Sequence, residues 1–102
     1  MGAKEWRSKR PKEIKIGWRT ITISWETNII ADDGSECYGQ YDHANKTIKT
    51  DDTLTGTLLL ATIIHEVVHA IEYEYHIPIP HYVVHWLDNV LAQTLGPFMF
   101  DE

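Results

Sequence analysis

Two histidines one helical turn apart, with a glutamate directly after the first, are the residues of this chain best suited to chemistry. They form the run His65-Glu66-Val67-Val68-His69. Because each residue of a helix advances by about 100°, His65 and His69 would lie on one face and Glu66 at its edge. Two neutral imidazoles can hold one divalent ion there, and a carboxylate beside them can take a proton from a water bound to that ion. The pattern predicts a zinc site with Glu66 as general base.

The surrounding residues favour a metal site over satisfied histidines in an ordinary core. An apolar run over residues 58–64 leads into the motif and continues beyond it, so the helix is apolar nearly all round and should be buried. Polar side chains buried in such a helix need partners, and a metal supplies one. The polar residues fall on a single stripe: Thr62, His65, His69, Glu72 and His76.

The fold expected from periodicity is α+β: a small antiparallel sheet of two hairpins, packed on the motif helix and on a second, C-terminal helix. The hairpins are expected over residues 14–25 and 38–50. The motif helix should run from about 54 to 75, capped by Asp51 or Asp52, and the second from about 81 to 95, ended by Gly96-Pro97. The apolar stripe expected on the second helix is Val84, Leu87, Leu91 and Leu95.

The length, charge and cysteine content of the chain limit its domain organisation and its possible functions. A chain of 102 residues allows one domain, expected over 13–95, between a flexible basic arm over 1–12 and a tail over 96–102. The net charge of −6 makes nucleic-acid binding an unexpected function. One cysteine, Cys37, excludes an internal disulfide and fits a reducing compartment. No apolar run is long enough for a membrane span, and no signal peptide or lipid anchor is evident, so a cytoplasmic protein is expected.

A catalytic zinc needs a third protein ligand and one open position. His85 and Asp88, neighbours on the flank of the second helix, would face the motif helix where the two pack. Glu72 shares the stripe of the two histidines, but a third ligand from the same helix has poor tetrahedral geometry, so a supporting or exposed position is expected for it. Cys37 is expected to be a small buried residue rather than a ligand.

The chain resembles the gluzincin metallopeptidases, in which such a helix is followed by a second helix carrying the third zinc ligand. Its size and layout are most similar to the minigluzincins, whose third ligand is His. The resemblance covers about residues 14–95, and its one highly specific motif is residues 65–69. It implies one catalytic Zn²⁺ held by His65, His69 and His85, with Asp88 or Asn89 orienting a ligand histidine.

The resemblance also implies peptide hydrolysis. Glu66 would be the general base, an extended peptide or protein substrate would pair with residues 38–41, and the C-terminal tail would cover the cleft as in a zymogen, within one chain or by self-association. The tail could equally pack on the core. The sequence does not choose a donor for the developing oxyanion, and the candidates are Tyr82, His81, Tyr73 and His43.

Two other functions remain open at this stage. A non-catalytic zinc-stabilised domain would use the same histidines for folding and would need a fourth protein ligand, from His43, Cys37 or Asp88. A protein-interaction or regulator-binding module would instead use the basic arm as its working part.

Overall fold

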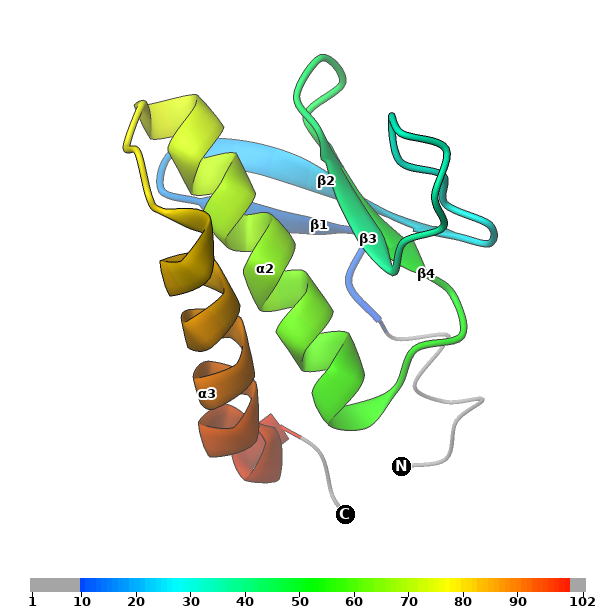
Figure 1. Cartoon of the computed structure of the whole chain (residues 1–102), viewed down its shortest axis with the longest axis vertical. Helices are drawn as coiled ribbons and strands as arrows, with labels where there is room; N and C mark the ends of the chain where they lie inside the picture. The colour runs from blue at the N-terminus through cyan, green and yellow to red at the C-terminus, as the bar shows by residue number, and fades with distance from the viewer. Residues whose placement is uncertain (1–9, 100–102) are drawn as a thin grey trace.

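Four strands form one sheet in the computed structural model, which describes residues 10–99 and their side chains as far as Pro97. The strands are β1 (Glu13–Ile16), β2 (Arg19–Glu26), β3 (Gly39–Asp42) and β4 (Thr47–Asp51). Their order in the sheet is β1-β2-β4-β3, which leaves β1 and β3 at the edges. Helix α2 (Gly56–Tyr75) packs on this sheet, and helix α3 (His81–Met99) packs on α2 (Figure 1). The predicted α+β class is confirmed.

The sheet is mixed rather than wholly antiparallel. The two predicted hairpins are present, since β1 pairs with β2 and β3 with β4 in antiparallel register. The hairpins join through a parallel pair, β2 with β4, in which Ile23 lies opposite Ile48. This pairing buries Ile21 and Ile48 completely. The expectation of a purely antiparallel sheet was therefore wrong, because local alternation specifies each hairpin but not which strands of two hairpins become neighbours.

The core lies between the sheet and α2. Ile16, Ile21 and Ile48 come from three strands and meet Ala70 of α2, which is fully buried. The strand residues alternate between this face and solvent, as expected for a sheet covered on one side. The partly buried apolar residues around this cluster are Ile14, Tyr41, Val67, Ile71 and Tyr75.

Helix α2 begins later than predicted, and neither predicted aspartate caps it. Its N-cap is Thr55, which makes no side-chain capping hydrogen bond. Asp51 closes the preceding turn instead, because its Oδ1 accepts hydrogen bonds from the Thr53 N–H (2.8 Å) and the Thr53 hydroxyl (2.7 Å). The helix ends at Tyr75, and the next residue, His76, is its C-cap, with a φ of 55° in the left-handed region typical of that position.

Helix α3 continues through the predicted stop signal to Met99, with Pro97 inside it. Residues 96–99 of the predicted tail are therefore helical, and residues 100–102 lie outside the described part. Gly96 is buried and faces α2, where a Cβ atom would lie 3.6 Å from the Thr57 hydroxyl oxygen. A Cβ atom would therefore make only an ordinary van der Waals contact, and Gly96 lies within the helix contact rather than ending α3.

The face that α3 turns to α2 differs from the predicted leucine stripe. Its buried positions are Val84, Asp88, Ala92 and Gly96, four residues apart. Leu87, Leu91 and Leu95 are exposed instead, so only Val84 of the predicted stripe was right. Small residues at the contact bring two helices close together, and the larger leucines then fall on the outer side.

The last residues of the predicted arm contact the sheet. Arg10 forms an ion pair with Asp52 and lies 4.4 Å over the Trp25 ring. The carbonyl of Pro11 accepts a hydrogen bond from Trp25 Nε1 at 2.9 Å. The rest of the predicted arm, residues 1–9, lies outside the described residues. Neither α2 nor α3 has the length and apolar character that crossing a bilayer requires.

Tyr75 joins the end of α2 to the β1–β2 turn. Its hydroxyl donates to the Ile16 carbonyl (2.6 Å) and accepts from the Trp18 N–H (3.1 Å). Gly17 stands between these residues with a φ of 63°, and a Cβ atom there would lie 2.1 Å from the Tyr75 hydroxyl oxygen. Only glycine fits this contact.

We expect Tyr75→Phe to lower the free energy of unfolding by about 1–2 kcal/mol, because two backbone groups lose their partner. Denaturant unfolding followed by circular dichroism measures this change. Tyr82→Phe, at an exposed tyrosine of α3, is the matched control and should leave stability unchanged. Equal midpoints for parent and Tyr75→Phe would contradict the role assigned to the hydroxyl.

Candidate metal centre

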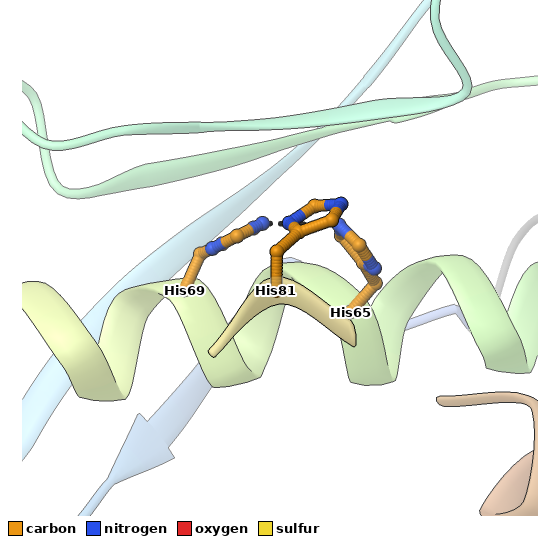
Figure 2. A group of neighbouring side chains, drawn as sticks. All are labelled: His65, His69 and His81. Atoms are coloured by element: carbon orange, nitrogen blue, oxygen red, sulfur yellow. Dashed lines mark hydrogen bonds between the residues drawn. The ribbon is translucent and has the colours of Figure 1, made fainter. Parts of the chain in front are cut away.

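His65 and His69 point their outer ring nitrogens at each other. The two Nε2 atoms are 3.0 Å apart, and the ring centroids are separated by 4.6 Å at an interplanar angle of 77° (Figure 2). Two nitrogen ligands of a tetrahedral zinc lie about 3.3–3.4 Å apart when each bond is about 2.0–2.1 Å. The spacing of the two imidazoles is therefore close to that of a pair sharing one ion.

The inner ring nitrogen of each histidine faces a carboxylate. His65 Nδ1 lies 2.6 Å from Asp88 Oδ2, and His69 Nδ1 lies 3.1 Å from Glu72 Oε1. A carboxylate only accepts hydrogen bonds, so the Nδ1 atom of each ring carries the proton and Nε2 presents a lone pair. Two lone pairs that face each other repel unless a proton or a cation lies between them. Carboxylates on Nδ1 are the usual outer partners of metal-binding histidines.

Asn89 supports this arrangement from α3. Its Nδ2 atom donates to Asp88 Oδ1 at 2.8 Å and to the His85 carbonyl at 2.8 Å. Asp88 is buried and uses one oxygen for His65 and the other for Asn89. The structure thus places Asp88, Asn89 and Glu72 where the sequence predicted supporting residues, with Asp88 and Glu72 directly on the two histidines.

The third histidine of the group is His81, from the first turn of α3. The nitrogen atoms that His65, His69 and His81 can offer to a metal all lie within 4.8 Å of one another. The His81 ring centroid is 5.6 Å from that of His65 and 6.0 Å from that of His69 (Figure 2). Among residues 10–99 this is the one cluster of candidate metal ligands. The sequence had suggested His81 only as an oxyanion donor.

His85, the predicted third ligand, lies outside this group. It is exposed and lines a cavity of about 310 Å³ together with His65 and Glu66. His81 and His85 are one helical turn apart and share a side of α3. The sequence analysis therefore expected a third histidine from this helix and from this side of it. The residue that lies beside His65 and His69 is His81, one turn before His85.

Glu66 is buried beside the histidines. Burial raises the pKa of its carboxyl group, and the charge of Asp88 acts in the same direction, whereas His65 and the backbone of Tyr41 lower it. A raised pKa brings a carboxylate closer to the range in which it exchanges protons near neutral pH. Burial also lowers the pKa of His69, which favours the neutral imidazole that binds metals.

Strand β3 passes directly over Glu66. A Cβ atom on Gly39 would lie 2.8 Å from Thr62 Cγ2 and 3.1 Å from Glu66 Cγ, so the absence of a side chain lets the strand reach the helix. The start of β3 and the residues before it form one wall of the cavity beside His65, since Cys37, Tyr38 and Gly39 line that cavity. Strand β3, the buried carboxylate of Glu66 and one histidine of the cluster, His65, therefore border one space.

The remaining candidates do not belong to the histidine cluster. Tyr73 stacks on His43 with centroids 4.8 Å apart, and Tyr82 is largely exposed on α3. Cys37 is partly buried, and its Sγ atom lies 3.7 Å from the Ile29 carbonyl oxygen. The oxyanion donor stays open.

Replacing Asp88 by asparagine should weaken zinc binding by about 10- to 100-fold, because the partner of His65 Nδ1 loses its charge. Competition with a fluorescent chelator measures the dissociation constant. Asp32→Asn, an exposed loop substitution, is the control and should leave affinity unchanged. Equal affinities for Asp88→Asn and the parent would show that this contact does not support a metal.

Comparisons of the chain with protein-family models, with curated proteins and with solved structures find no match. Its function has to be inferred from the positions of its own side chains.

Proposed function

We propose that this protein is a zinc-dependent peptidase whose metal ligands are His65, His69 and His81. The observation that carries the proposal is the approach of two Nε2 atoms to 3.0 Å while both Nδ1 atoms face carboxylates. A divalent cation relieves the repulsion between the two lone pairs, and His81 supplies a third nitrogen.

The type of ligand favours zinc. Three imidazoles suit a borderline metal that accepts tetrahedral coordination, whereas calcium and magnesium prefer oxygen. Three protein ligands also leave the fourth position free, as in catalytic zinc sites. When bound, zinc would polarise a substrate carbonyl and lower the pKa of a water at that position.

Glu66 is the residue placed to move the proton. Its carboxylate is buried next to His65 and borders the same cavity, so a water or a peptide in that cavity is within its reach. As general base Glu66 accepts a proton from the attacking water, and as general acid it returns the proton to the leaving amine. Its raised pKa suits both halves of this cycle.

Strand β3 is the element suited to holding a peptide. It lies at the edge of the sheet, pairs with β4 on one side only, and contacts α2 near Glu66. An extended peptide can add to such an edge through main-chain hydrogen bonds. This arrangement supports the gluzincin-like interpretation of the sequence, in which residues 38–41 bind substrate and a helix after the motif carries the third ligand.

A metal-stabilised domain without catalytic activity is the second candidate. The favouring observation is that α2 and α3 are joined through the cluster, since the contacts of His65 and His69 with Asp88 and His81 cross the two helices. Zinc would then stabilise the fold, as small domains require. Buried Glu66 would have no task in such a domain.

Glu66→Gln distinguishes the two functions. We expect the variant to bind zinc as tightly as the parent and to lose peptide cleavage by about 10²–10⁴-fold, because the amide cannot accept the proton. Zinc content and cleavage of a quenched fluorescent peptide library are measured on the same samples. Cleavage that stays at the parent's rate would remove Glu66 from the mechanism.

The third ligand is tested by the pair His81→Ala and His85→Ala. Loss of an imidazole ligand should weaken zinc binding by at least tenfold in His81→Ala, whereas His85→Ala should keep the parent's affinity. The two variants are matched controls, since both residues are exposed histidines on one side of α3. The opposite result would return the third ligand to His85.

A further inference from the structure

Helix α3 carries almost no charge. Of its 19 residues only Asp88 is an Asp, Glu, Lys or Arg, and Asp88 is buried against α2 on His65. A surface helix of a small protein normally presents charged residues to water. The outer side of α3 presents none.

The outer side of α3 is apolar instead. Trp86 is 69% exposed and Val90, one turn later, is 48% exposed. The exposed apolar side chains follow two rows along the helix, each with a spacing of four residues, and the exposed polar residues Gln93 and Thr94 lie among them. We call this surface the α3 face, and it consists of Tyr82, Trp86, Leu87, Val90, Leu91 and Leu95.

No other described element covers the α3 face. Among the strands and helices of residues 10–99, α3 contacts α2 alone, and Figure 1 shows it at the outer side of the molecule. Apolar surfaces of more than a few hundred Å² are uncommon on monomers and mark sites of association.

The charge of the chain indicates what covers this face. The protein has a net charge of −6, so two copies repel wherever their acidic surfaces meet. The α3 face is free of charged side chains, and two copies can approach there without placing like charges in contact. A lipid surface is a poorer partner, because helices that bind membranes have Lys or Arg on their polar face and α3 has neither.

The size of the face is sufficient for a dimer. Burying six side chains that include a tryptophan and a tyrosine, on both copies, removes on the order of 1,000 Å² of surface from water, which is the lower range of specific interfaces. Exposed aromatic residues near the centre of such a patch are typical anchors of an interface.

We propose that two copies of this chain pair through the α3 face around a two-fold axis. In such an isologous pairing the same six residues serve on both sides. The opposite side of α3 carries His81 and Asp88, so the dimer would also hold the helix that completes the metal centre. The proposal concerns association and does not depend on peptidase activity.

Sedimentation equilibrium of the purified full chain, with and without added zinc, tests the pairing. The parent should reach twice the 11.8 kDa mass of one chain within the micromolar range. Trp86→Glu and Val90→Glu should each raise the dimer dissociation constant at least tenfold, since each places two buried carboxylates in the interface. Both positions are exposed in the single chain, so circular dichroism and zinc content should stay as in the parent.

Trp18→Glu is the matched control, because Trp18 is 80% exposed and lies on the β1–β2 turn rather than on α3. It should leave the dimer intact. A parent that stays at the mass of one chain throughout the micromolar range would overturn the proposal, as would a dimer that survives both α3 substitutions. Binding of a monomeric parent to phosphatidylserine vesicles would assign the face to lipid instead.

Discussion

Two imidazole lone pairs held face to face are the constraint around which this fold is arranged. Their Nε2 atoms lie 3.0 Å apart, and each ring is turned into this position by a carboxylate on its other nitrogen. Asp88 comes from α3 and Glu72 from α2, so the orientation of His65 depends on the packing of the two helices. Without a proton or a metal cation between the two nitrogens this arrangement costs free energy, because it combines lone-pair repulsion with the burial of polar groups. With a cation the same contacts become the interactions that join α2 to α3.

The burial of Glu66 lowers the stability of the fold, although it suits the proton transfer proposed for this residue. Burial raises the pKa of its carboxyl group, which means that the folded protein at neutral pH carries a charge that the unfolded chain holds more easily. A core built for stability alone would place an apolar residue here. Gly39 shows the same compromise, since its missing side chain brings the edge of the sheet onto the helix beside this carboxylate. Both residues line the small cavity beside His65, and a purely structural metal site would require neither feature.

The sequence predicted the parts of this structure that depend on local patterns. Both hairpins and α2 follow from periodicity, and the place of Glu72 on the side of the two histidines follows from helical spacing. A supporting role for Asp88 was implied only by the resemblance to the gluzincins. The parallel pairing of β2 with β4 does not, because it depends on contacts between distant segments. The choice between His81 and His85 depends on how α3 is rotated about its axis, and the buried positions Val84, Asp88, Ala92 and Gly96 show that rotation. The prediction that Leu87, Leu91 and Leu95 form the buried stripe was wrong for the same reason. Apolar periodicity identifies the apolar positions of a helix. It does not predict which of two apolar sides packs on the partner helix.

X-ray absorption at the zinc edge of the purified full chain tests the central claim most directly. The account predicts one zinc per chain, with three imidazole nitrogens and one further light ligand at about 2.0–2.1 Å. Loading in proportion to protein, with no sulfur scatterer, would agree with a site formed by His65, His69 and His81. A protein that binds no zinc under these conditions, or an ion enclosed by four protein ligands including the Cys37 sulfur, would contradict it.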